Sequence, residues 1–236
     1  MAGRWKAATV VVAGLLTLAA SAGFLVLGFG AVGASPCDVD LRLAALESAR
    51  TQNQAAMAIG DCSSELAAYG ADVYGWEALA FTPAWVLLAL ALTAYVARGC
   101  PRWWRLLGYA LPLAAAAANI VLAQSRLNMA QEVIVAADPN RLIDLSLWIK
   151  GAALLAHAAL LIVACLRQQP ARTLLAICMG GAALLAVFWV FDPATWSNLA
   201  FAIWTPAVLL ACKEACLPSP APDPPYPRWD RPAAPP

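Results

Sequence analysis

Charged residues are scarce in this sequence of 236 residues, and histidine occurs only once. Charged residues make up 12% of the chain and hydrophobic residues 62%, and the mean hydropathy is +0.69. Soluble globular domains carry about 25% charged residues, so the composition argues against a soluble architecture. It predicts an integral membrane protein whose principal partner is the lipid bilayer.

Motifs that would identify a reaction centre are also absent from the sequence. It contains no Gly-rich phosphate loop, no nucleophile elbow, no histidine pair and no C-x-x-C spacing. The apolar runs hold no paired carboxylates, and we expect no pair of opposite charges between helices. We therefore predict no enzyme activity, no cofactor and no metal. The net charge of +1 gives no reason to expect nucleic-acid binding.

Two cysteines near the C-terminus have the best metal-ligand spacing in the chain. Cys212 and Cys216 stand one helical turn apart, and together with Cys165 or Cys178 they would offer soft thiolates to copper or zinc. No Met-rich or His-x-x-x-His pattern accompanies them. Cysteine is also a small apolar residue that packs well between helices, and this packing role is the favoured interpretation.

Long apolar runs occupy most of the chain. A transmembrane helix needs about 20 mainly apolar residues to cross roughly 30 Å of hydrocarbon. Apolar residues in these runs are continuous and do not alternate, so they predict helices and not the strands of a barrel. We expect an all-α integral membrane helix bundle with six transmembrane helices, near residues 8–31, 79–97, 106–124, 146–166, 173–191 and 197–212.

Basic and acidic gaps alternate along the chain between the apolar runs. Lys and Arg residues in short loops are retained on the cytoplasmic side. Ten of them fall before the first run, between the second and third, between the fourth and fifth, and after the sixth, whereas acidic residues concentrate in the other gaps. This distribution predicts a multi-pass protein of the inner (plasma) membrane with both termini in the cytoplasm, N-in and C-in.

The runs divide the sequence into four parts. Residues 1–32 form the first transmembrane helix, and residues 33–78 form an outer, periplasmic or extracellular, helical loop. Residues 79–216 form a five-helix membrane bundle, and residues 217–236 form a cytoplasmic tail with nine prolines that we expect to be disordered. The first segment also has features of a secretory signal, but its apolar run exceeds the usual length of about 7 to 15 residues, so a retained helix is favoured.

The outer loop contains Cys37 and Cys62, the two cysteines expected on the oxidising side of the membrane. Such a pair favours a disulfide bond. One straight helix between them would separate the sulfurs by roughly 37 Å, so a bridge requires a helical hairpin, with the polar residues 51–54 as the expected turn. We interpret the bond as a structural staple, because a redox-active pair usually has C-x-x-C spacing.

A few polar residues fall inside the apolar runs, where charge is costly. Lys150 and His157 lie two turns apart on one face of the fourth run, and Asn119 and Asn198 fall at similar outer depths in the third and sixth. These four side chains form the candidate ligand-binding or proton-linked site, lining one cavity that opens outward. The alternatives are that Lys150 reaches water or pairs with Asp144 or Asp192, and that His157 forms a hydrogen bond across helices.

A short stretch of sequence occurs twice without a gap. Its residues are Asp72, Trp76, Leu79, Ala80 and Phe81, and then Asp192, Trp196, Leu199, Ala200 and Phe201. Both copies enter the membrane from the outer side. Parallel repeats of a transporter would produce such a pattern, but the offset does not extend to whole domains. Independent use of tryptophan as an interfacial anchor is the favoured explanation.

The sequence leaves two functional hypotheses open. The first is a non-catalytic accessory or interaction subunit, which binds a membrane or cytoplasmic protein through the tail at 217–236; Tyr226 and Trp229 in this tail offer stacking groups. The second is a small-solute permease or channel-like transporter with an outward-facing polar site around Lys150 and His157.

Overall fold

The computed structural model of the chain describes residues 2–31, 37–49, 52–97, 100–130 and 139–168, together with Leu209 and Lys213. The regular elements within these ranges are all helices, which confirms the all-α prediction. The expected span at 173–191, nearly all of the span at 197–212 and the tail at 217–236 lie outside the described residues.

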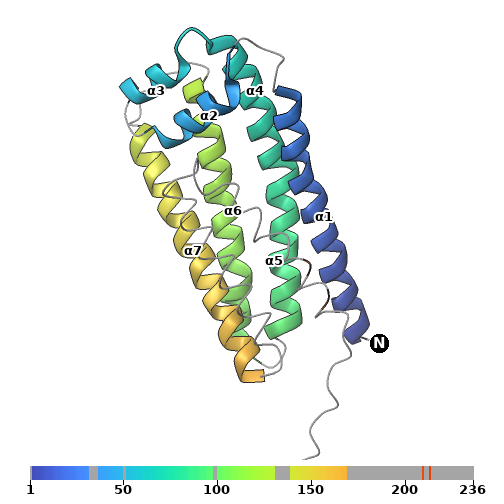
Figure 1. The fold of residues 1–236 in the computed structure, drawn as a ribbon. Coiled ribbons are helices and arrows are strands. Elements are labelled where there is room, and N and C mark those ends of the chain that lie inside the picture. The colour runs from blue at the N-terminus through green and yellow to red at the C-terminus, as the bar shows by residue number, and fades with distance from the viewer. Residues whose placement is uncertain are drawn as a thin grey trace, which may run out of the picture.

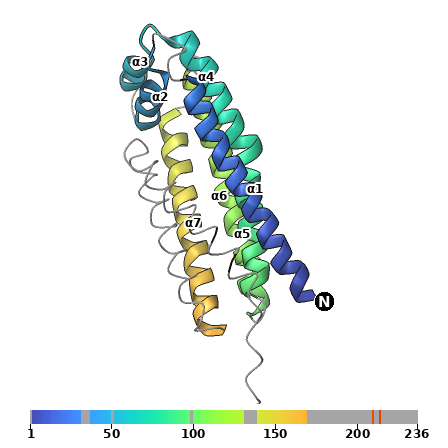
Figure 2. The same ribbon diagram turned by 45° about the vertical axis from the view of Figure 1, so that its right-hand side comes forward.

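Four long helical segments lie side by side and alternate in direction (Figures 1 and 2). The second of them is continuous, because α4, a short π-helix η1 and α5 follow one another without a break. Two short helices, α2 and α3, cover the end of the bundle at which α1 and α6 finish. The bounds are α1 Ala2–Ala31, α2 Val39–Ser48, α3 Gln52–Ile59, α4 Ser63–Trp76, η1 Glu77–Phe81, α5 Thr82–Val96, α6 Arg102–Ala130 and α7 Pro139–Gln168.

Three segments in the described part of the chain are long and apolar enough to cross a membrane: Ser63–Val96, Arg102–Asn128 and Arg141–Ala164. In α1 the stretch Ala8–Phe24 is a shorter apolar helix. The prediction of membrane-crossing helices therefore holds for three of the expected runs. The second begins at Ser63 and not near residue 79, so the boundary drawn between residues 78 and 79 falls inside a continuous helical segment.

Apolar side chains join the long helices in three clusters. One cluster brings Val10 of α1 against Leu92 of α5 and Leu161 of α7. The others join α5, α6 and α7 through small residues, and α6 to α7 near the covered end; their buried members are Trp85, Val86, Ala89, Ala115 and Ala153, and Leu122, Ile143 and Leu147. Small residues let helices approach closely where lipid replaces water as the solvent.

The structure brings Cys37 and Cys62 to disulfide distance, with their Cα atoms 6.1 Å apart. Cys37 lies directly before the N-cap of α2, and Cys62 is the N-cap residue of α4. The chain leaves α2 at Ala49, whose ψ of 132° is extended, and α3 begins at Gln52. The separate helices α2 and α3 replace one straight helix, as the bridge requires, and residues 52–54 of the polar stretch belong to the first turn of α3 and not to the turn between the helices.

Arg42 of α2 closes the far end of α3. Its Nη1 atom donates hydrogen bonds to the carbonyl oxygens of Ala58 and Ile59, at 3.2 and 3.1 Å. A guanidinium is favourable there because the last carbonyls of a helix carry partial negative charge. Gly60 follows with a φ of +51°, a backbone conformation that favours glycine, and a Cβ on it would lie 2.7 Å from Nη1, so Arg42 would have to shift.

The covering helices share a core with the bundle. Leu43 and Leu46 of α2, Ile59 of α3 and Leu66 of α4 are buried in one cluster, which also contains Ala123 of α6. We call α2, α3 and the first half of α4 the outer cap. Because this cap packs on α6 and its α4 part continues without a break into η1 and α5, it is fixed to the bundle and is not a loose loop.

Candidate functional site

A wider helical turn interrupts the second long segment at the level of Glu77. The N–H of Thr82 donates to the carbonyl of Glu77, five residues earlier, which is the bonding pattern of a π-helix. Pro83 follows and has no N–H to continue the regular pattern. Turns of this kind are frequent at functional sites. Here the turn directs both Glu77 and Thr82 toward α6.

Asn119 of α6 lies at the centre of a polar cluster that joins three helical segments. Its Nδ2 atom donates to Glu77 Oε1 and to Thr82 Oγ1, at 2.9 Å each. Its Oδ1 atom accepts a hydrogen bond from Lys150 Nζ of α7. The ammonium of Lys150 is also 3.9 Å from Glu77 Oε1, which makes an ion pair. We call Glu77, Thr82, Asn119 and Lys150 the polar cluster.

The charges on each side fix the orientation of the Asn119 amide. Its oxygen faces the ammonium of Lys150, and its nitrogen faces the carboxylate of Glu77. The flipped amide would place its N–H₂ group against a donor with no acceptor capacity, and its oxygen against a carboxylate. The amide therefore bridges the two charges, and each of its ends is bonded.

The polar cluster is buried. Exposures are 8% for Glu77, 2% for Thr82, 1% for Asn119 and 7% for Lys150. A buried charge is costly unless a counter-charge or hydrogen-bond partner compensates it. Burying an acid and a base together offsets part of that cost, since each supplies the counter-charge of the other. The two charges cancel, so the cluster as a whole is neutral.

Helix lengths give the depth of the polar cluster along the bundle. Glu77 lies nineteen residues before Val96, the last residue of α5, and Lys150 lies eighteen before the end of α7. At 1.5 Å per residue both are roughly 27 to 29 Å from those helix ends. A hydrocarbon layer of roughly 30 Å that starts at these ends would therefore reach the polar cluster.

His157 belongs to a different polar contact. Its Nε2 atom is 3.0 Å from Thr93 Oγ1 of α5, and that hydroxyl donates to the carbonyls of Ala89 and Gly108, at 2.9 and 3.1 Å. The hydroxyl has only one proton, so when it donates to either carbonyl it accepts from Nε2 of His157. A Cβ on Gly108 would lie 2.5 Å from the Thr93 methyl, so glycine allows the close approach of α5 and α6 here.

The structure thus divides the residues predicted from sequence. Lys150 and Asn119 are brought together, and Asn198 lies outside the described residues. His157 makes the hydrogen bond across helices that was its alternative role, roughly 10 Å along α7 from Lys150. The pair of Lys150 with Glu77 corrects the expectation that no opposite charges would meet between helices.

Sequence reasoning missed Glu77 and Thr82 as members of the site. Glu77 was assigned to the outer loop because it precedes the apolar run that begins at residue 79. One signal was available: Glu77 is the last charge before that run, and Pro83 just beyond it predicts a disturbed helical turn. The partner helix, however, is set by tertiary packing that the spacing does not encode.

Comparison with protein-family models, with curated proteins and with solved structures finds no match to this chain. Any inference about its function therefore has to come from its own residues.

Proposed function

We propose that this chain is a six-helix, multi-pass protein of a bacterial-type inner (plasma) membrane, with both termini in the cytoplasm. We propose further that it is a non-catalytic accessory subunit, which binds another protein through its Pro-rich tail at 217–236. The alternation of basic and acidic gaps between the apolar runs supports this topology. The tail has the composition of an extended, partner-binding segment.

The observation that carries the accessory role is the mutual bonding of the polar cluster. A solute pathway needs polar groups that a solute can reach. Asn119 is 1% exposed, and both ends of its amide are engaged by Glu77, Thr82 and Lys150. Such a cluster fixes the relative positions of the helices that contribute to it. This rigidity suits a scaffold that presents its cap and its tail to other proteins.

Purification in mild detergent from the native host tests this role. The full-length chain and a chain truncated after Leu217 would be isolated, and the co-purifying proteins identified by mass spectrometry. We expect a stoichiometric partner with the full-length chain and its loss on truncation. His157→Ala is the matched control, because it leaves the tail intact and should retain the partner. A homo-oligomer without a partner in every preparation would contradict the accessory role.

A small-solute permease or channel-like transporter is the second candidate, and one observation favours it. Lys150 and Glu77 are ionisable residues within apolar helical segments, and such residues often mark ion or substrate pathways. This hypothesis expects Lys150→Ala or His157→Ala to abolish solute flux in proteoliposomes while the protein still folds and inserts. The accessory hypothesis expects no flux in the unaltered protein.

A further inference from the structure

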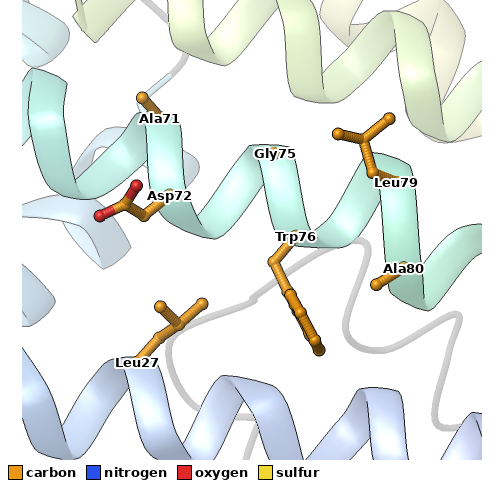
Figure 3. Close-up of a pocket in the computed structure, with 7 residues that line it drawn as sticks. All are labelled: Leu27, Ala71, Asp72, Gly75, Trp76, Leu79 and Ala80. Atoms are coloured by element: carbon orange, nitrogen blue, oxygen red, sulfur yellow. The ribbon is translucent and has the colours of Figure 1, made fainter.

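A groove lies between α1 and the α4 to η1 segment, on the side of Trp76 that faces α1 (Figure 3). Its volume is about 590 Å³, and it is an open groove on the surface and not an enclosed cavity. The lining is apolar apart from one carboxylate; the residues are Leu27, Ala71, Asp72, Gly75, Trp76, Leu79 and Ala80. We call this the outer groove.

Trp76 is held firmly against α1 at the floor of the outer groove. Its indole Nε1 donates a hydrogen bond to the carbonyl of Ala20, at 2.7 Å. Gly23 makes room for the ring, since a Cβ there would overlap the indole. One turn deeper, the rings of Phe24 and Phe81 meet edge to face at 5.3 Å. The ring position is therefore set by α1, while 36% of Trp76 remains exposed.

Polarity changes along the outer groove in the direction of the membrane normal. Trp76 lies twenty residues before the end of α5, which is roughly 30 Å along the helix. A hydrocarbon layer that starts at the end of α5 would therefore end at the level of Trp76. Asp72 is one turn beyond it, roughly 6 Å further out and at headgroup level. Ala80 lies one turn beyond Trp76 in the other direction and lines the deeper part, whereas Leu27 lies at the level of Asp72. In Figure 3, Asp72 and Trp76 project from α4 toward α1, and Leu27 projects from α1 toward them.

Four of the seven residues that line the outer groove belong to the stretch that the sequence uses twice. Asp72, Trp76, Leu79 and Ala80 line it, and Phe81 anchors the turn below. The same five types recur at the same spacing within 192–201, a stretch outside the described residues. An anchoring role alone accounts for the tryptophan and the apolar residues, but it does not require an acidic residue one turn further out.

We propose that the outer groove binds a phospholipid whose headgroup ends in a primary ammonium, as in phosphatidylethanolamine. Charge complementarity selects this occupant, because the carboxylate of Asp72 is the only charge among the described residues that line the groove, and it would repel an anionic headgroup. The exposed face of Trp76 adds attraction for a cation. An acyl chain then packs against Leu79 and Ala80 in the hydrocarbon layer, where the lining is apolar.

Lipid selectivity of the full-length chain tests this proposal. The protein would be placed in nanodiscs of equal phosphatidylethanolamine and phosphatidylglycerol, extracted in mild detergent, and its retained lipids counted by native mass spectrometry. We expect the ethanolamine lipid to be enriched about threefold to fivefold over the glycerol lipid. One partly exposed ion pair together with a cation–π contact gives a preference of this order. Asp72→Asn should remove the enrichment and leave the fold intact, because Asp72 is exposed.

Two controls make the outcome decisive. Asp61→Asn removes an exposed carboxylate of the outer cap that is not part of the outer groove, and it should keep the enrichment. Phosphatidylcholine in place of phosphatidylethanolamine keeps the positive charge but removes the ammonium N–H donors, so its enrichment should be weaker. Equal retention of both lipids by the unaltered protein, or enrichment that persists in Asp72→Asn, would overturn the proposal.

Discussion

Replacing Lys150 by methionine should strongly destabilise the bundle, although methionine is more apolar and of similar length. The substitution removes the counter-charge of Glu77, which is 3.9 Å from Lys150 Nζ, and it removes the hydrogen-bond donor to Asn119 Oδ1. Glu77 is 8% exposed, so solvent offers its carboxylate little compensation. We therefore predict that a substitution favourable by hydropathy is unfavourable in the folded protein.

Two routes to the magnitude agree. Two unit charges about 4 Å apart interact by about 4 kcal/mol at an effective dielectric constant of about 20. Removal of one partner from a buried pair costs about 3 to 5 kcal/mol, because the other charge is left behind. We therefore expect Lys150→Met and Glu77→Gln each to lower the free energy of unfolding by about 3 kcal/mol.

The double variant Lys150→Met/Glu77→Gln should be about as stable as either single variant, and not twice as destabilised, since it leaves no charge in the cluster and the glutamine oxygen can still accept from Asn119. A coupling energy of about 3 kcal/mol would result. A neutral hydrogen bond between transmembrane helices gives only about 0.6 kcal/mol, so the value separates an ion pair from a simple polar contact.

Unfolding in mixed micelles of rising dodecyl sulfate content, followed by tryptophan fluorescence, supplies the four free energies. The chain has ten tryptophans, which makes this signal strong. Ile149→Met is the matched control: it neighbours Lys150 but is 42% exposed, and it should change stability little. A coupling energy below about 0.5 kcal/mol would refute the ion pair and with it the polar cluster.

Three further substitutions test the cap and the groove wall. Cys37→Ser removes the disulfide that closes a loop of 25 residues, and it should destabilise the cap by about 3.5 kcal/mol. The measurement is the rate of proteolysis of the cap, which should rise; a rate equal to that of the unaltered protein would contradict a stabilising disulfide. Arg42→Met removes both hydrogen bonds to the end of α3 and should lower the stability of the cap by about 1.5 kcal/mol in the same assay. An effect below about 0.5 kcal/mol, as for an ordinary surface residue, would contradict this role of Arg42. Gly23→Ala should lower the thermal stability by about 1 to 3 kcal/mol, because a Cβ at this position overlaps the Trp76 ring. Helix propensity alone predicts the opposite, a gain of about 1 kcal/mol, so a measured gain would contradict the packing of α1 on Trp76.

The sequence predicts the helices well because apolar runs of this length have few other solutions. It predicts their ends less well. The polar first half of α4 contributes no membrane signal, yet Leu66 and Tyr74 are buried in the cap, so tertiary packing extends the helix beyond the apolar run. The reversal between Cys37 and Cys62 was predictable from reach alone, because a straight helix cannot bring the two sulfurs together.

The candidate site is predicted only in part for a similar reason. Spacing along one helix predicts that Lys150 and His157 share a face, but their contacts lie at different depths, with Asn119 and with Thr93. Which residue faces each of them depends on how α5 and α6 pack, and this is non-local information. Glu77 becomes a partner of Lys150 through such packing, together with the π turn beside Pro83.

The central claim is that the polar cluster is closed to water, as a scaffold requires and a solute pathway does not. Thr82→Cys tests it most directly, because cysteine is nearly isosteric with threonine and Thr82 is 2% exposed within the cluster. Right-side-out membrane vesicles would be treated with a membrane-impermeant thiol reagent, with Ala68→Cys, on the exposed surface of α4, as the positive control. We expect the reagent to label Ala68→Cys and to leave Thr82→Cys unlabelled. Labelling of Thr82→Cys at a rate similar to that of Ala68→Cys would contradict the claim and favour the permease.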